Sequence, residues 1–192
     1  MSIELNTTKN VLSIVDVDIN SEKPSGHLQI FFGMGCFWGA ERKFWSLKGV
    51  FTTAVGYAGG HLENPKYDDV CSGETGHAEV VRVFYNPSNT SLEDLMRIFW
   101  ESHNPTQLNR QGNDKGTQYR SIILTDNKEL LPKLKSSKKK YQEKLNRQSA
   151  GIIQTKIELL KKFYLAENYH QKYLHKNPNG YCGLQGTGID YV

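Results

Sequence analysis

Cysteine is scarce in this chain. Its 192 residues include only three, Cys36, Cys71 and Cys182, and no Cys-x-x-Cys pair. An odd number at these spacings argues against a disulfide framework and against a structural zinc site. The six histidines show no metal-ligand spacing either, because His170 and His175 stand five residues apart. We therefore expect no metal and no cofactor, and interpret the cysteines as catalytic or redox thiols in a reducing compartment.

Targeting and membrane-spanning segments are also missing from the pattern. Residues 1–26 mix acidic residues with short apolar pieces and have neither a basic n-region nor a continuous apolar h-region, so no signal peptide is predicted. No run approaches the ~18 apolar residues of a membrane helix. These features favour a cytoplasmic protein without a membrane partner. We expect an N-terminal arm, residues 1–26, followed by a single domain, residues 27–192.

Charge of one sign is in small excess, with a formal net charge of +4. Much of the positive charge lies in residues 133–144, around Lys138-Lys139-Lys140. Interleaved Tyr141, Glu143 and Leu145 are typical of a solvated helix face, so we expect no nucleic-acid partner. A basic binding module built on this helix is the alternative to an enzyme, and salt-sensitive binding to nucleic acid would reveal it.

The stretch Gly35-Cys36-Phe37-Trp38-Gly39 is the sharpest feature present. It follows the apolar residues 27–33, which predict a strand, and precedes a helix-like segment that ends by Gly49. A cysteine at a helix N-terminus faces free N–H groups and a positive dipole, which lower a thiol pKa and create a nucleophile. The opposing interpretation is a buried small hydrophobe. Flanking glycines, which let a ligand come close, favour the functional interpretation.

Glu79 is the second candidate. Residues 77–85 alternate as a strand does, and Glu79 falls on the same face as Val81 and Val83. A carboxyl buried on an apolar face has a raised pKa and can act as an acid. The alternative is a register in which Glu79 points to solvent beside Arg82.

The remaining pattern mixes strands and helices without strict alternation and without repeats, which predicts an α+β fold. The clearest helix covers residues 91–103, where apolar residues recur at helical spacing and Thr90 and Glu93 have capping-box spacing. The other expected segments are strands at 50–57, 119–125 and 152–160, helices from about 127 or 132 to 148 and over 166–176, and polar loops at 58–76 and 106–117.

A glycine-rich tail begins at about residue 177 and shows no periodicity, so we expect mobile coil. It carries Cys182. A mobile thiol is exposed to oxidation, which argues for a redox use with either Cys36 or Cys71 as its partner. For Cys71 itself a structural role is the simpler interpretation.

Six segments spread over roughly residues 27–184 occur in a characteristic order. They are residues 35–39 and the stretches Tyr67-Asp68-Asp69-Val70-Cys71-Ser72-Gly73, Thr75-Gly76-His77-Ala78-Glu79-Val80-Val81, Gln111-Gly112-Asn113-Asp114-Lys115-Gly116-Thr117-Gln118-Tyr119-Arg120-Ser121, Ala166-Glu167-Asn168-Tyr169-His170-Gln171-Lys172-Tyr173-Leu174 and Gly180-Tyr181-Cys182-Gly183. In composition and order these segments resemble the peptide methionine sulfoxide reductase A family.

The resemblance implies a compact α+β fold with a mixed sheet wrapped by helices, as a two-layer α/β roll with a ferredoxin-like core and a long coil C-terminal tail. We expect a monomer. Cys36 matches the family nucleophile, Glu79 the acid that protonates the sulfoxide oxygen, and Cys182 the resolving cysteine. Residues 27–192 would then be one catalytic reductase domain whose tail, from about residue 177, carries the resolving thiol.

The resemblance also implies the substrate contacts. Phe37 and Trp38 match the aromatic residues that hold the S-methyl group, and Tyr67 and Tyr119 match hydroxyls that position the sulfoxide oxygen. Asp114 matches a polar contact to substrate and active-site water. Taken alone, such tyrosines are more often packing residues and such an aspartate a plain turn residue, so these roles rest on the resemblance.

The implied activity is reduction of the S epimer of methionine sulfoxide, free or in oxidised proteins, as protein repair in oxidative-stress defence. The implied intermediates are a sulfenic acid at Cys36 and a Cys36–Cys182 disulfide, which thioredoxin as the partner would reduce. Many family members carry another tail cysteine, whereas Asp190 stands near that place here. A cysteine hydrolase or acyltransferase using Cys36 with His77 is the alternative class, which a trapped thioester rather than a sulfenic acid would reveal.

Overall fold

A six-stranded sheet forms the centre of the fold in the computed structural model, which describes residues 17–192. The strands lie in the order β7-β6-β1-β3-β2-β8. Neighbours are antiparallel except β6 and β7, so the sheet is mixed. The strands are β1 (Leu28–Gly33), β2 (Val50–Ala58), β3 (Ala78–Tyr85), β6 (Ile122–Thr125), β7 (Lys156–Leu159) and β8 (Phe163–Leu165), and a separate hairpin pairs β4 (Arg110–Gln111) with β5 (Asp114–Lys115).

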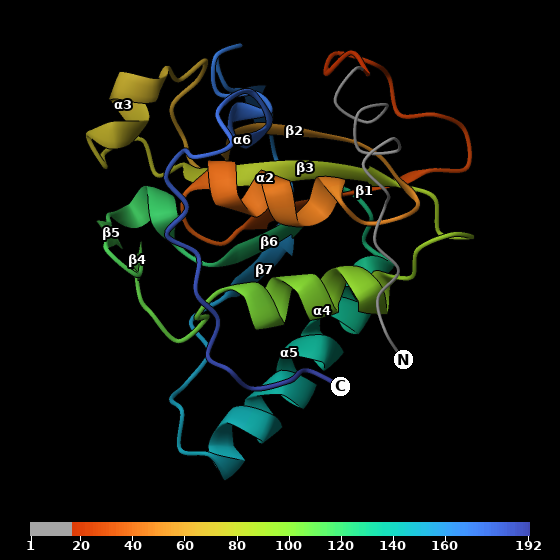
Figure 1. Cartoon of the computed structure of the whole chain (residues 1–192), viewed down its shortest axis with the longest axis vertical. Coiled ribbons are helices and arrows are strands. Elements are labelled where there is room, and N and C mark those ends of the chain that lie inside the picture. Colours follow the sequence, from red (N-terminus) through yellow and green to blue (C-terminus); the bar gives the residue numbers. More distant parts are fainter. Residues whose placement is uncertain (1–16) are drawn as a thin grey trace.

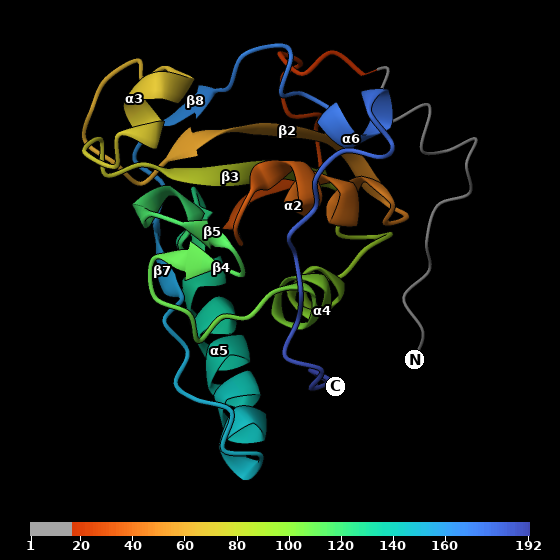
Figure 2. The same ribbon diagram turned by 60° about the vertical axis from the view of Figure 1, so that its left-hand side comes forward.

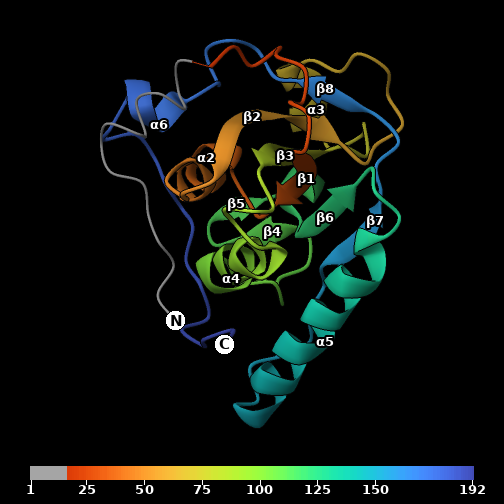
Figure 3. The ribbon, with the colours of Figure 1, turned by 90° about the vertical axis from the view of Figure 1, so that its right-hand side faces the viewer.

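The helices gather mainly on one face of this sheet, where α2 and α4 lie side by side (Figures 1 and 3). The long helix α5 projects away from the rest of the fold (Figure 2). The helices are α2 (Phe37–Trp45), α3 (Tyr67–Cys71), α4 (Leu92–Ser102), α5 (Leu130–Arg147) and α6 (Tyr173–Lys176), with a 3-10 turn at Thr117–Tyr119. The predicted α+β class is therefore confirmed. No helix among residues 17–192 is long and apolar enough to cross a membrane.

The two faces of β3 have the predicted alternation. Val81 and Val83 join the large core beneath the helices, whereas Ala78 and Val80 pack in a smaller cluster on the opposite face. Glu79 is only 2% exposed, and its position on the strand directs it toward the helical layer. The solvent-facing register is therefore wrong, and a carboxyl enters an apolar environment.

Helix α4 covers the core with Leu95, Met96, Phe99 and Trp100, as its apolar spacing predicted. Its cap differs from the prediction. Ser91 is the N-cap, and it shares reciprocal hydrogen bonds with Asp94. The capping box predicted at Thr90 and Glu93 is therefore one residue too early in the sequence. The Thr90 hydroxyl instead donates to the Lys48 carbonyl.

The predicted helix over residues 166–176 is wrong for most of its length, since only α6 is helical and β8 precedes it. Gln171 explains the departure. Its side chain accepts from the Val55 N–H and donates to the Val55 and Ala166 carbonyls, so it satisfies backbone groups of the neighbouring strand.

Other boundaries also move. The strand predicted at 152–160 begins only at Lys156, where parallel pairing with β6 starts, and the strand predicted at 119 begins at Ile122 because Tyr119 lies in the 3-10 turn. The polar loop at 106–117 contains the β4–β5 hairpin. Within the predicted arm, residues 1–16 lie outside the described residues, and 17–26 are coil and turns. Beyond α6 the chain is coil, as predicted for the tail.

Candidate active site

Cys36 occupies the N-cap position of α2, and only Met34 and Gly35 separate it from the end of the central strand β1. Gly35 reaches this junction with a φ of 102°, a left-handed conformation that favours glycine. The backbone N–H groups of Trp38 and Gly39 point at the Cys36 sulfur. The predicted strand-to-helix junction is therefore present, with a half-buried thiol at the free N–H groups of the helix.

The pKa of the Cys36 thiol is nevertheless raised, contrary to the prediction from the helix N-terminus. Burial is the largest cause, and the carboxylate of Glu79 adds to it, while the two backbone N–H groups act in the opposite direction. Removing the sulfur from water costs the thiolate more free energy than the hydrogen bonds return. In this resting geometry Cys36 is a neutral thiol at pH 7.

Glu79 lies against the same end of α2. Its Oε2 accepts the backbone N–H of Phe37 at 3.0 Å. Burial raises the pKa of Glu79 to about 8; the Phe37 N–H opposes this shift and Asp114 adds to it. Glu79 is therefore mainly protonated at pH 7, and an O–H donor stands beside the residue that follows Cys36.

The two aromatic residues after Cys36 have different surroundings. Phe37 is 1% exposed and packs against the rings of Tyr57 and His170, at centroid distances of 6.0 and 5.0 Å. Trp38 is half-buried, stacks on Tyr173 at 3.9 Å and donates from Nε1 to His170 Nδ1 at 3.0 Å. The rings form an ordered apolar wall next to the thiol and the acid.

The two predicted tyrosines and Asp114 approach this centre from other segments. Burial raises the pKa of Tyr119, and Glu79, Cys36 and Asp114 raise it further through their charges. The pKa of Tyr67 is likewise raised, chiefly by burial and then by its hydrogen bond with Cys71.

These electrostatic interactions show that Tyr119 lies near Cys36, Glu79 and Asp114, and that Tyr67 lies near Glu79 and Tyr119. Two tyrosines whose hydroxyls stay protonated at neutral pH thus lie in the neighbourhood of the acid.

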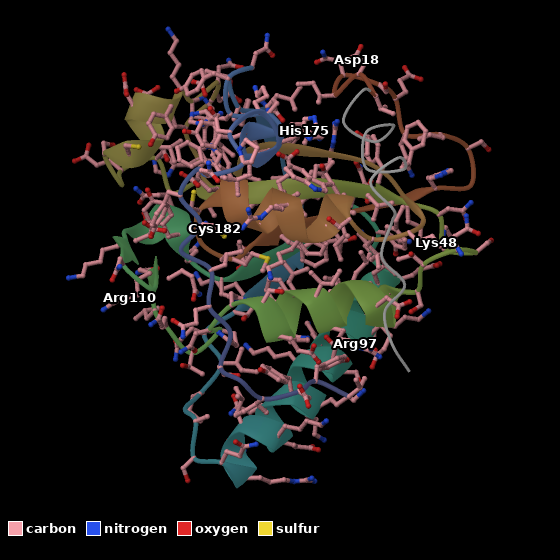
Figure 4. All side chains as sticks on the ribbon, viewed as in Figure 1. Asp18, Lys48, Arg97, Arg110, His175 and Cys182 are labelled. Atoms are coloured by element: carbon pink, nitrogen blue, oxygen red, sulfur yellow. The ribbon has the colours of Figure 1, made fainter. Side chains whose placement is uncertain are left out.

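Cys182 reaches the same end of α2 from the tail, where Figure 4 labels it. A side chain added at Gly39 would place its Cβ only 2.8 Å from the Cys182 sulfur. Cys36 and Gly39 are three residues apart, so they lie on the same side of the first helical turn. Gly39 therefore serves both thiols: its N–H faces Cys36, and its missing side chain makes room for Cys182.

The neighbouring part of the tail borders a cavity of about 390 Å³, lined by Gly112, Asn113 and residues 181–185. Tyr181 donates its hydroxyl to Asp114 Oδ1 at 3.3 Å. The residue before Cys182 is thus connected to a predicted substrate contact, and the third thiol, Cys71, is exposed on α3.

The segment 166–172 contains contacts that the sequence did not reveal. Glu167 accepts the Tyr57 hydroxyl and the Tyr67 backbone N–H, both at 2.9 Å, so it holds the start of α3. Lys172 forms a buried ion pair with Glu41 at 2.8 Å. Polar residues at nearly every position from 167 to 172, without an apolar period, were the available signal for a non-helical, side-chain-bonded segment.

His77 does not fit the role of a catalytic base for Cys36. Its Nδ1 accepts the Gly60 backbone N–H at 3.1 Å, and its Nε2 bonds the Leu62 carbonyl at 2.7 Å. Both ring nitrogens therefore serve the backbone of the loop after β2. Within residues 17–192, no group of three or more His, Cys, Asp or Glu side chains is arranged to hold a metal ion.

Comparisons with known proteins agree with this geometry. Residues 28–189 match the family described as peptide methionine sulfoxide reductase. The peptide methionine sulfoxide reductase MsrA of Photobacterium profundum is 57% identical over 175 residues, covering 91% of this chain and 83% of that protein. The human mitochondrial peptide methionine sulfoxide reductase is 58% identical over 166 residues, covering 86% and 71%.

Solved structures share the fold. Methionine sulfoxide reductase A of Corynebacterium diphtheriae superposes with a TM-score of 0.80 at 43% identity, covering 83% of this chain and 79% of that one. Yeast Mxr1 in reduced form gives a TM-score of 0.76 at 38% identity, covering 85% and 92%. The chain belongs to the peptide methionine sulfoxide reductase MsrA family.

Proposed function

We propose that Cys36 is the nucleophile and Glu79 the proton donor with which this peptide-methionine (S)-S-oxide reductase reduces its substrate. The observation that carries the proposal is the buried Glu79 carboxyl, held by the Phe37 N–H at 3.0 Å with a pKa of about 8. A sulfoxide oxygen leaves sulfur only once it is protonated, so the donor must be neutral at pH 7. Burial on β3 meets this requirement.

In the first step the Cys36 sulfur attacks the sulfoxide sulfur while Glu79 gives its proton to the oxygen. The Glu79 carboxylate formed in this way recovers a proton from the Cys36 thiol. The hydroxyl group then moves from the substrate sulfur to the Cys36 sulfur, which breaks both the substrate S–O bond and the new sulfur–sulfur bond and leaves one electron pair on the substrate sulfur. The products are methionine, reduced by two electrons, and a sulfenic acid at Cys36. Thiol and sulfoxide are thereby converted to sulfenic acid and thioether without an external reductant.

The surrounding rings determine how the substrate lies. We assign Phe37 and Trp38 to the S-methyl group, which needs apolar contacts, and the hydroxyls of Tyr67 and Tyr119 to the sulfoxide oxygen. Asp114 contacts the polar backbone of the substrate or water. With methyl and oxygen held by different groups, only one epimer at sulfur presents its remaining substituent to solvent, which accounts for selectivity toward a single epimer. The family supports the S epimer.

Recycling uses the tail. The Cys182 thiol attacks the sulfenic sulfur, which forms a Cys36–Cys182 disulfide and releases water, and a dithiol reductant then exchanges with that disulfide. Thioredoxin is the reductant we propose, supported by yeast Mxr1, which has been solved in complex with Trx2 (TM-score 0.56, 24% identity, covering 89% of this chain and 96% of that one). The family supports methionine sulfoxide, free and in oxidised proteins, as substrate. Three free thiols support a reducing cytoplasm as its location. We also propose that the enzyme acts as a monomer.

We also infer that the four inner strands constitute a ferredoxin-like core. The elements β1-α2-β2-β3-α4-β6 follow the βαββαβ order, and their strands lie as β6-β1-β3-β2. With α2 and α4 on one face, this supports a two-layer roll to which β7, β8 and the coil tail are added.

Cys36→Ser tests the nucleophile. The variant is expected to lose reduction of S-methionine sulfoxide completely with dithiothreitol and with thioredoxin, whereas Cys71→Ser, the matched control, retains it. Turnover is followed as methionine released from each epimer, free and in a peptide. Substantial S-epimer reduction by Cys36→Ser would refute the assignment.

A further inference from the structure

The end of the tail, a few residues after Cys182, is attached to the helical layer. Tyr191 is fully buried, and its backbone N–H donates to Glu101 Oε1 of α4 at 2.8 Å. Its ring packs against that of Tyr141 of α5, with the Lys140 ammonium 4.3 Å from its centre. The last residues of this chain are therefore held between two helices, as Figures 1 and 2 show for the segment that ends near α4 and α5.

Tyr141 reinforces this attachment from the α5 side. Its hydroxyl hydrogen-bonds Thr187 Oγ1 at 2.7 Å and donates to the Ile189 carbonyl at 3.0 Å. Ile189 is itself buried. We call Thr187, Ile189 and Tyr191 the C-terminal anchor.

We propose that the C-terminal anchor is a positioning element for the recycling step, because it keeps the Cys182 sulfur over Gly39 and thus beside Cys36. This inference rests on the proposed function. Cys182 lies between two attachment points, α6 on one side and the anchor on the other, and only four residues separate it from Thr187. A segment held at both ends samples a smaller volume than one held at a single end, so its thiol has a higher effective concentration at a fixed target.

The tail between Cys182 and the C-terminal anchor packs closely against the helices, which agrees with this role. A Cβ at Gly186 would lie 2.0 Å from the Glu101 carbonyl oxygen, so the backbone runs directly against the end of α4. Leu184 packs on the open sides of Gly35 and Gly39. The contacts from residue 184 to 191 thus lead without interruption from the first turn of α2 to α5, and loosening their far end frees the part that carries Cys182.

The step concerned is the attack of the Cys182 thiol on the Cys36 sulfenic acid, which forms the disulfide and releases one water. Reduction of substrate by Cys36 precedes it and does not involve the anchor. Loss of the anchor is therefore expected to leave the first methionine unaffected and to slow disulfide formation by about tenfold, the difference between a thiol held in place and one on a flexible chain.

The test compares Tyr191→Ala with Tyr191→Phe in the full chain, each reduced and then mixed with one equivalent of S-methionine sulfoxide. Rapid quenching gives the rate of methionine formation, and trapping with dimedone together with thiol counting gives the lifetime of the sulfenic acid. Tyr191→Ala should form methionine at the wild-type rate but retain the sulfenic acid about ten times longer. Tyr191→Phe, which keeps the ring and the backbone bond, should match wild type.

Tyr141→Phe provides a second measurement that does not depend on Tyr191. It removes only the hydroxyl that bonds Thr187 and Ile189, and it should prolong the sulfenic acid several-fold. Disulfide formation at the wild-type rate in both Tyr191→Ala and Tyr141→Phe would overturn the inference. If wild type itself formed no Cys36–Cys182 disulfide, the proposed recycling route would fail first, so the two failures are distinguishable.

Discussion

Gly39→Ala offers a sharp test of how the two thiols share the first turn of α2. The substitution adds one methyl group at a residue whose φ lies outside the left-handed region, so the backbone accepts alanine without strain. That methyl group would lie 2.8 Å from the Cys182 sulfur and 3.2 Å from Leu184. Both neighbours belong to the tail, so the tail has to move.

The size of that movement sets the expected effect. Ordinary contacts between non-bonded heavy atoms are about 3.5–4.0 Å, so the sulfur must retreat by roughly 1 Å. A displacement of about 1 Å between reacting groups costs up to 10²-fold in rate. Stability should fall by at most about 2.5 kcal/mol, because alanine in a helix gains about 0.5–1 kcal/mol over glycine and overpacking costs about 1–3 kcal/mol. We therefore expect formation of the Cys36–Cys182 disulfide to be about 10- to 100-fold slower, in an enzyme that still folds.

The assay separates the two steps. Gly39→Ala should release the first equivalent of methionine at close to the wild-type rate, since the Gly39 N–H that faces Cys36 is retained, and should then accumulate sulfenic acid that dimedone traps. With dithiothreitol, which reaches Cys36 directly, multiple turnover should be largely restored. If Gly39→Ala formed the disulfide as fast as wild type, the inferred seating of Cys182 on Gly39 would be incorrect.

Three further predictions follow from the site and its supports. Glu79→Gln should slow methionine formation in a single turnover by roughly 10²-fold or more. The wild-type rate should decline as pH rises through about 8, where Glu79 loses its proton, and Glu79→Gln should lack this decline. A wild-type rate that does not change with pH would contradict the acid role. Cys182→Ser should yield about one methionine per enzyme and then fail to cycle with thioredoxin, and full cycling would point to Cys71 as the resolver. Lys172→Met should lower the free energy of unfolding by about 3 kcal/mol, because it leaves the buried Glu41 carboxylate without its cation. Denaturant titration measures this change. The matched control is Lys162→Met, which removes an exposed ion pair with Glu63 and should have little effect.

The same pKa of Glu79 also predicts how stability varies with pH. Its folded pKa of about 8 is above its usual value of 4.5, so between these limits the folded state keeps a proton that the unfolded chain has released. This contribution to stability is complete below about 4.5 and is lost as pH rises toward about 8. Glu79→Gln should lack that dependence in denaturant titrations across this range.

The local sequence pattern was sufficient to predict the direction of site residues that lie on a strand or at a helix end. Alternation along residues 77–85 put Glu79 on the apolar face, because strand geometry alone decides which side a residue takes. The junction at Cys36 was equally readable from an apolar strand, a glycine and a helical segment. In both cases the nearest neighbours in the sequence determine the direction of the side chain.

Segment 166–172 was not predictable in the same way, because its conformation depends on distant partners. Gln171 bonds the backbone of Val55, and Lys172 adopts a left-handed φ of 52° with its ammonium on Glu41. These residues are more than a hundred positions apart in the sequence, and their helical spacing was a coincidence of composition. The family resemblance indicated that the segment is important, but the sequence does not reveal which groups its polar side chains bond.

The predicted lowering of the Cys36 pKa was wrong for a related reason. Helix N–H groups are local and visible in sequence, whereas the burial that outweighs them is a property of the whole fold. The same burial raises the pKa of Glu79, so at neutral pH both groups carry their protons. A resting thiolate is therefore not required.

A neutral pair has an advantage for this chemistry. Two adjacent anions at Cys36 and Glu79 would repel each other, and above pH 8 the Glu79 carboxylate raises the thiol pKa further while the sulfoxide loses its proton donor. Below pH 8 the neutral carboxyl removes that repulsion, so the N–H groups of Trp38 and Gly39 oppose only burial and the charge of Asp114 as negative charge develops on sulfur. In the mechanism we propose, transfer of the Glu79 proton to the oxygen then creates a base next to the thiol when Cys36 releases its own proton. In the proposed mechanism Glu79 therefore activates Cys36 only when a sulfoxide is present to accept the proton, and the free enzyme stays in its protonated form.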